Sequence, residues 1–115
     1  MTLNVTDPLL PDLWLFHDED ECADFLTKQF GDAPLIEGAK ATTFYSEGEC
    51  VVLMLPTDET WDEQAAVLVH EAWHVVCGHL EYLREDEAGE ETVAYLIQAV
   101  SLALFDAHRE WLESR

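Results

Sequence analysis

A continuous apolar run at residues 51–55 constrains the fold more than any other feature of the sequence. Its five residues, Val-Val-Leu-Met-Leu, lack the polar alternation of a strand with one face in water, and Pro56 ends the run. Such a strand is buried on both faces, so it is expected to be the most interior strand of a sheet. A chain of 115 residues is long enough to build this core once, which predicts a single domain over residues 1–115.

A β-hairpin is predicted to contain that strand. The β-branched residues 41–45 and the apolar residues 50–55 are separated by Ser-Glu-Gly-Glu, and Gly48 can adopt the positive φ of a tight turn. Residues 13–16 form a short run rich in aromatic side chains, which is typical of another strand. Residues 1–12 are predicted to form an irregular lead-in.

Three helices are expected around these strands. The first begins in the acidic residues 18–21, whose carboxylates favour a helix N-terminus, and ends at Gly31. The second starts near Trp61 with a capping box, and its apolar character on nearly all sides predicts a path through the core. After a charged connection at residues 81–89, a final helix runs from about 90 to 113. The predicted fold class is α+β.

The charge of the chain is strongly negative. It has 25 Asp and Glu against five Lys and Arg, which gives a net charge of -20. Such a field repels nucleic acid and anionic membranes, and it favours a basic protein partner or cations, or simply a hydrated surface. Three cysteines at unrelated spacings argue against a disulfide framework, and no secretion signal or bilayer-spanning apolar stretch is visible. These features predict a soluble cytoplasmic protein.

Residues 70–74, with the sequence His-Glu-Ala-Trp-His, interrupt the apolar second helix with polar groups. Positions four apart on a helix lie about 40° apart around its axis, so His70 and His74 project from one face, one turn apart. Glu71 lies about 100° round from His70, beside any ion that the two imidazoles share. Because buried polar groups need partners, a zinc ion would satisfy all three side chains together.

Catalytic zinc usually takes three protein ligands, so a third ligand has to be sought. The metzincin pattern would require Gly at position 77 and His at position 80, but Cys77 and Leu80 stand there. Cys77 follows His74 on the same face and could be a ligand, although a free Cys in an apolar helix is more often a small buried residue. Glu90 and Glu91, which open the last helix, are better candidates, and a helical wheel places Glu90 nearer the buried side.

Three features follow one another in the sequence: the His-Glu-x-x-His motif at residues 70–74, a short charged connection, and Glu-x-x-Ala at residues 91–94. Their order resembles the gluzincin metallopeptidases, in particular the compact minigluzincin-like proteins, some of which are phage-encoded. The resemblance covers the order of elements over about residues 41–105. It implies a zincin-like domain in which a small antiparallel sheet packs on the motif helix and a long C-terminal helix supplies a ligand. It also implies that His70, His74 and Glu91 bind zinc. Tyr95 stands where the family often has an Asp or Asn that braces a metal-binding His.

The resemblance further implies a mechanism and a substrate class. Glu71 would act as general base, and an extended peptide would lie alongside a strand that borders the cleft, here residues 50–55. The group that steadies the oxyanion stays open among Tyr45, Tyr82, Tyr95 and His108. The isolated His17, His79 and His108 are each predicted to be surface or hydrogen-bonded residues.

Three functional hypotheses follow. The first is a zinc-dependent hydrolase, most specifically a small metallopeptidase that acts on peptides or proteins. The second is a non-catalytic binding module stabilised by zinc. The third is an acidic protein that mimics nucleic acid and inhibits a basic host protein.

Overall fold

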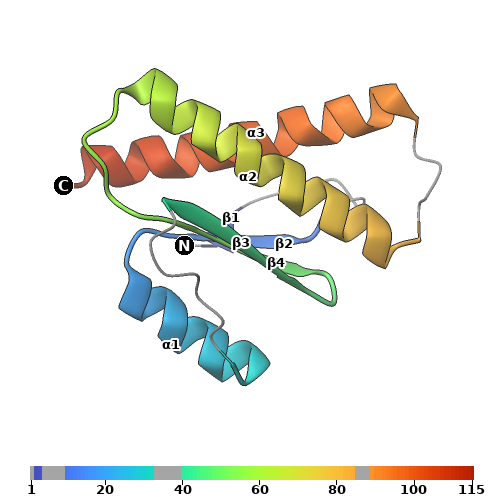
Figure 1. Cartoon of the computed structure of the whole chain (residues 1–115), viewed down its shortest axis with the longest axis horizontal. Coiled ribbons are helices and arrows are strands. Elements are labelled where there is room, and N and C mark those ends of the chain that lie inside the picture. Colours follow the sequence, from blue (N-terminus) through green and yellow to red (C-terminus); the bar gives the residue numbers. More distant parts are fainter. Residues whose placement is uncertain (1, 4–9, 33–39, 85–88) are drawn as a thin grey trace.

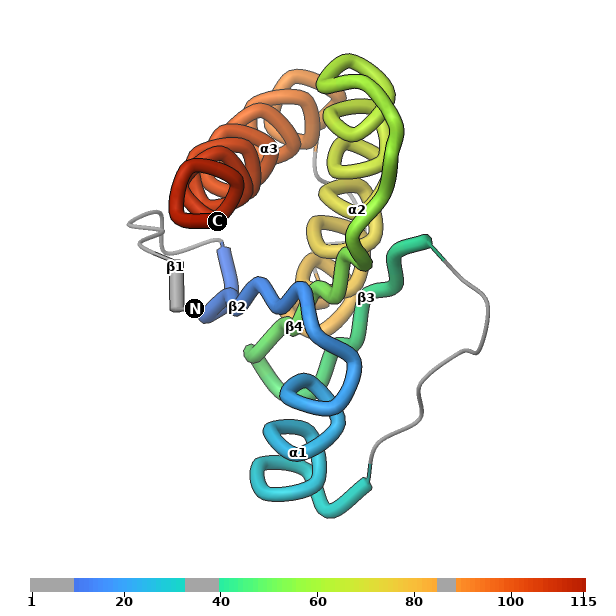
Figure 2. Tube along the Cα trace, turned by 90° about the vertical axis from the view of Figure 1, so that its left-hand side faces the viewer, coloured from blue at the N-terminus to red at the C-terminus, as the bar shows by residue number. Residues whose placement is uncertain are grey.

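The chain forms one four-stranded sheet with helices on both of its faces (Figure 1). A computed structural model describes residues 2–3, 10–32, 40–84 and 89–115. Helix α1 covers one face of the sheet, and helices α2 and α3 cover the other (Figures 1 and 2). This arrangement confirms the α+β class. The elements in chain order are β1 (Thr2–Leu3), β2 (Asp12–Phe16), α1 (Glu19–Phe30), β3 (Ala41–Ser46), β4 (Glu49–Met54), α2 (Trp61–Tyr82) and α3 (Glu90–Glu113).

The strand order is β1-β2-β4-β3. Strands β3 and β4 form the predicted antiparallel hairpin, and β1 is antiparallel to β2, but β2 and β4 run parallel. The expectation of an antiparallel sheet is therefore wrong, because α1 and β3 together return the chain so that β4 can align with β2 in the same direction. The irregular lead-in expected at residues 1–12 also contains β1 and the first residue of β2, while residues 4–9 lie outside the described part.

Strand β4 is buried on both faces, as its apolar sequence predicts. Cys50, Val52 and Met54 belong to the larger hydrophobic cluster, which includes buried residues of α2 and α3. Val51 and Leu53 belong to a second cluster with buried residues of α1. The alternation of a strand thus divides one apolar run between two cores.

Local signals place the hairpin turn and the ends of α1 as predicted. Gly48 adopts a φ of 87° in the turn, next to Glu47 with a φ of 45°. Asp18 caps α1 by accepting a hydrogen bond of 2.9 Å from the backbone N–H of Glu21, and Gly31 ends the helix with a φ of 78°.

Helix α2 begins at the predicted capping box, which Thr60 and Glu63 form, and continues to Tyr82. Residues 81–82, expected in the connection, are therefore helical, whereas residues 85–88 lie outside the described part. The prediction that α2 runs through the core holds for one side of the helix only, because the sheet and α3 cover only part of its circumference. Val69 remains 41% exposed and Trp73 50% exposed.

Gly78 lies within α2 and does not end it. A Cβ atom at this position would lie 3.3 Å from Cγ of Tyr45 on β3, which is a tight contact. The glycine therefore lets α2 approach the sheet closely. Helix α3 has the predicted limits, and none of the helices in the described part of the chain is long and apolar enough to cross a membrane.

Candidate metal centre

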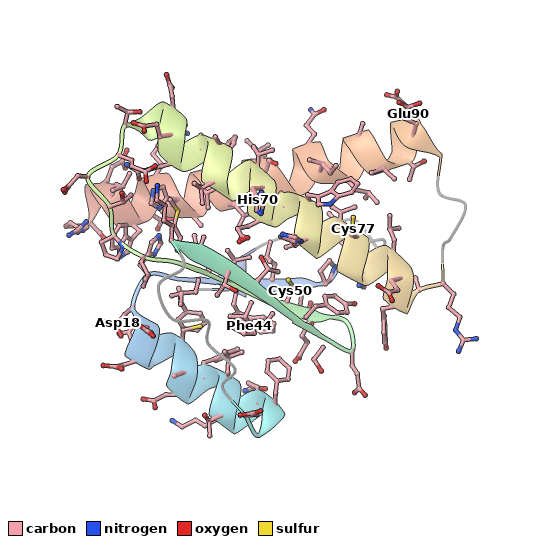
Figure 3. The ribbon with its side chains drawn as sticks, in the orientation of Figure 1. Asp18, Phe44, Cys50, His70, Cys77 and Glu90 are labelled. Atoms are coloured by element: carbon pink, nitrogen blue, oxygen red, sulfur yellow. The ribbon has the colours of Figure 1, made fainter. Side chains whose placement is uncertain are left out.

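The three polar residues of the motif lie together in the middle of α2, where Figure 3 labels His70. His70 and His74 are exposed, whereas Glu71 is only 4% exposed. The Nε2 atoms of the two histidines lie 3.2 Å apart. One ligand atom from each of the three residues lies within 4.8 Å of the others, and no second group of this kind occurs among the residues that the structure describes.

The separation of the two nitrogens fits a shared metal ion. Two nitrogens bound to a tetrahedral zinc at about 2.0–2.1 Å lie about 3.3–3.4 Å from each other. Two neutral imidazoles arranged in this way, with both Nε2 atoms unprotonated, would point their lone pairs at each other, so the pair requires a cation or a shared proton between the rings. His70 and His74 could therefore hold a metal ion between them, or share one proton in an N–H···N hydrogen bond.

Glu71 is held between α2 and the sheet. The hydroxyl group of Thr43 on β3 donates a hydrogen bond of 3.2 Å to Oε2 of Glu71. Burial raises the pKa of the Cys50 thiol to about 12, and the negative charge of Glu71 adds to this effect. Cys50 is therefore a protonated thiol at neutral pH.

The structure does not bring Glu91 to the histidines. Helix α2 continues for eight residues beyond His74, about 12 Å along its axis. Figure 1 shows this end of α2 and the first turn of α3 on the same side of the molecule. Glu91 is exposed, and Figure 3 shows Glu90 at the N-terminal end of α3, away from His70. Cys77 is also outside the group, and burial raises the pKa of its thiol. The identity of the third protein ligand stays a prediction.

An open concavity of about 370 Å³ adjoins the motif. It lies between the start of β3 and α2, and its lining residues are Lys40, Ala41, Ala66, Val67, His70 and Glu71. Lys40 forms an ion pair with Glu59, which raises the pKa of Lys40 chiefly through their hydrogen bond. The motif at residues 70–74 does not predict that Lys40 or Thr43 lies near it. The one sequence feature that distinguishes Lys40 is that it is among only five basic residues of the chain.

The strand beside the motif is β3, not β4. Strand β4 pairs with β2 on one side and with β3 on the other, so it has no free edge. Within the described part of the chain, β3 pairs on one side only, at the end of the strand order. The expectation that residues 50–55 border the cleft is therefore wrong, because a strand apolar on both faces belongs inside the sheet.

The remaining histidines are hydrogen-bonded, as predicted. His79 Nδ1 lies 2.5 Å from the hydroxyl oxygen of Tyr45, which also accepts a hydrogen bond from the backbone N–H of Gly48. Burial raises the pKa of Tyr45 to about 12. His108 contacts His17 through Nδ1 and Gln64 through Nε2, so the ring of His108, like the hydroxyl group of Tyr45, already has hydrogen-bond partners within the protein.

Comparison with protein-family models, curated proteins and solved structures found no match for this chain. The gluzincin resemblance therefore rests on the motif at residues 70–74 and on the Glu-x-x-Ala at residues 91–94.

Proposed function

We propose that this protein binds a zinc ion through His70 and His74 and acts as a small zinc-dependent hydrolase, most specifically a metallopeptidase. The observation that carries the proposal is the pair of Nε2 atoms 3.2 Å apart, beside the buried carboxylate of Glu71. Glu91 is the third zinc ligand in this proposal. To reach the ion, the first turn of α3 has to lie closer to His74 than it does in the structure.

The residues around the ion have distinct roles in the proposed reaction. A zinc ion at this position would activate a water molecule for attack on a carbonyl carbon at neutral pH. Glu71 accepts the proton of that water and returns it to the leaving amine. Thr43 keeps the carboxylate in place through its hydrogen bond. The ammonium group of Lys40 lines the same concavity and, once released from its ion pair with Glu59, would stabilise negative charge on the substrate.

The proposed substrate is a peptide or protein segment in extended conformation. Strand β3 is the edge strand of the sheet next to α2. A peptide that pairs with β3 would pass the motif at residues 70–74. The concavity at the start of β3 is open and could accept a side chain next to Glu71.

A non-catalytic module stabilised by zinc is the second candidate. Both histidines are exposed, and Trp73 between them in sequence is 50% exposed. A partner that covers this face of α2 could supply the remaining ligands, with Trp73 as an apolar anchor. In that case the ion joins two molecules and hydrolyses nothing.

One experiment separates the two candidates. Elemental analysis and a peptide-hydrolysis assay are applied to the full chain and to Glu71→Gln, His74→Ala and the control Glu81→Gln, an exposed position on the same helix. A hydrolase is expected to bind zinc and cleave peptide in the native and Glu81→Gln forms, to keep zinc but lose cleavage in Glu71→Gln, and to lose both in His74→Ala. Zinc binding without cleavage in the native, Glu81→Gln and Glu71→Gln forms, with zinc lost in His74→Ala, would favour the module. A native chain without affinity for zinc would contradict both.

We also place the protein in the cytoplasm. Its three cysteines, Cys22, Cys50 and Cys77, are free thiols, which suits a reducing compartment.

A further inference from the structure

A second cavity, of about 430 Å³, lies at the carboxyl ends of β2 and β4. These strands are parallel neighbours, but β2 leads into α1 on one face of the sheet while β4 leads into α2 on the other (Figure 1). Adjacent parallel strands whose connections leave to opposite faces create a crevice that commonly binds ligands. The lining residues are Leu15, Phe16, His17, Asp18, Glu21, Pro56 and Trp111.

A chain of hydrogen bonds, buried at its centre, fixes the tautomer of His17. Gln64 donates from Nε2 to the backbone oxygen of Glu59 at 2.6 Å, so its Oε1 accepts from Nε2 of His108, also at 2.6 Å. Nδ1 of His108 is then the acceptor, and Nε2 of His17 donates to it at 2.8 Å. Because His108 is only 2% exposed, water cannot readily reorganise this chain. The other nitrogen of His17, Nδ1, therefore carries a lone pair and can only accept a hydrogen bond.

The ring of His17 is uncharged at neutral pH. Burial, and to a lesser extent the neighbouring His108, lower the pKa of His17 to about 4. The ring stacks on the indole of Trp111, with centroids 3.8 Å apart and planes inclined by 5°. His17 is thus a fixed and neutral acceptor on one wall of the cavity.

The charge of the cavity is negative. Asp18 and Glu21 contribute carboxylates, and the lining contains no Lys or Arg. A helix N-terminus usually attracts anions, but here the first turn of α1 carries Glu19, Asp20 and Glu21, and Asp18 already uses the backbone N–H of Glu21. One positive charge lies beside the cavity: the guanidinium carbon of Arg115 is 4.5 Å from the centre of the Trp111 ring, and this charge contributes to the lowered pKa of His17. The two carboxylates of the lining outnumber it, so a cationic ligand is favoured over an anionic one.

We propose that this cavity binds a small organic cation, a guanidinium or primary ammonium group on a short apolar stem. Its N–H groups donate to Nδ1 of His17 and to the carboxylates of Asp18 and Glu21. The apolar stem lies against Phe16 and the edge of the Trp111 indole, because His17 and Arg115 occupy the faces of that ring. The site is separate from the metal centre and requires no zinc.

A titration of the full chain with agmatine, followed by ¹H–¹⁵N NMR in 0.15 M NaCl and with a chelator present, tests this inference. The salt screens the general attraction of an acidic protein for cations. We expect saturable chemical-shift changes of the indole N–H signal of Trp111. This signal is assigned by its absence from the spectrum of Trp111→Phe. Glu21→Gln should weaken binding roughly tenfold, whereas Glu19→Gln should change it less than twofold. Glu19 is the matched control because it carries the same charge in the same turn but does not line the cavity.

Two further measurements guard against a variant that fails to fold. Long-range ¹H–¹⁵N spectra of the native protein should show His17 protonated at Nε2 and a shift of its Nδ1 signal on addition of agmatine. Inorganic phosphate and butanoate should leave the signals of both residues unaffected.

The peptide acetyl-Ala-Arg-Ala-amide distinguishes the two sources of a guanidinium group. Tighter binding than agmatine would identify the ligand as a protein side chain, and weaker binding would identify it as a free amine. Equal effects of Glu19→Gln and Glu21→Gln, shifts with phosphate instead of agmatine, or no shift at Trp111 and His17 would each overturn the inference.

Discussion

Thr43 on β3 donates a hydrogen bond of 3.2 Å to the carboxylate of Glu71 on α2. The contact joins residues 28 positions apart and supplies a donor to a carboxylate that is only 4% exposed. It links the edge strand of the sheet to the motif helix at the point where a general base is proposed.

Thr43→Val should destabilise the protein by about 1–3 kcal/mol, because it leaves a buried carboxylate without this donor. Urea denaturation of the metal-free chain measures the change in the free energy of unfolding. Thr43→Ser restores the hydroxyl group and should recover most of the loss. Equal stability of the Val and Ser variants would show that the hydrogen bond contributes nothing.

Zinc should stabilise the native protein and neither of its single histidine variants. An ion at 100 times its dissociation constant raises the free energy of unfolding by about 2.7 kcal/mol when it binds the folded state alone. Differential scanning calorimetry should show this gain for the native chain and for His17→Gln, and no gain for His70→Ala or His74→Ala. A gain that survives in both alanine variants would place the ion elsewhere.

Gly78→Ala should destabilise the protein, although alanine is favoured over glycine in helices by about 1 kcal/mol. The new Cβ would lie 3.3 Å from Cγ of Tyr45, whose hydroxyl group is held by His79 and Gly48. We expect a net loss on the order of 1 kcal/mol from this overpacking, measured by thermal unfolding. In a Tyr45→Leu background the same substitution should stabilise the chain, and a double-mutant cycle gives the coupling.

The folded protein should lose stability as the pH falls from about 6.5 to about 4. His17 has its pKa lowered to about 4 in the folded state by burial and by His108, whose own pKa is also lowered by burial. The unfolded chain therefore takes up the proton first on acidification, and the loss is complete below the folded pKa. The ring is only half-buried, so we expect about 1–2 kcal/mol after allowance for solvent screening. The difference between the native chain and His17→Gln isolates this effect from the titration of the carboxylates.

The parts of the fold that depend on neighbouring residues could be predicted from the sequence. Asp18, Gly31 and Thr60 set helix ends through contacts within a few residues, and Gly48 sets the hairpin turn in the same way. The burial of β4 on both faces follows from its composition alone. The i, i+4 spacing likewise predicts that His70 and His74 meet, because one helix fixes both positions.

The parts that depend on distant residues could not be predicted in this way. The parallel alignment of β2 with β4 depends on how α1 and β3 return the chain, which no local pattern specifies. A Glu-x-x-Ala pattern says nothing of the distance between Glu91 and His74, which the length of α2 and its connection determine. His17 and His108 are 91 positions apart, so only the fold brings their nitrogens to 2.8 Å.

The placement of both histidines one turn apart on a single helix limits what an ion can cross-link. An ion bound by His70 and His74 cross-links one turn of α2 and connects it to no other element. Native-state hydrogen exchange should then slow in the middle of α2 alone when zinc is added. If Glu91 joins the ion, the same addition also protects the first turn of α3, because the metal then fastens two helices. The extent of protection along the chain thus reports the number of elements that hold the ion.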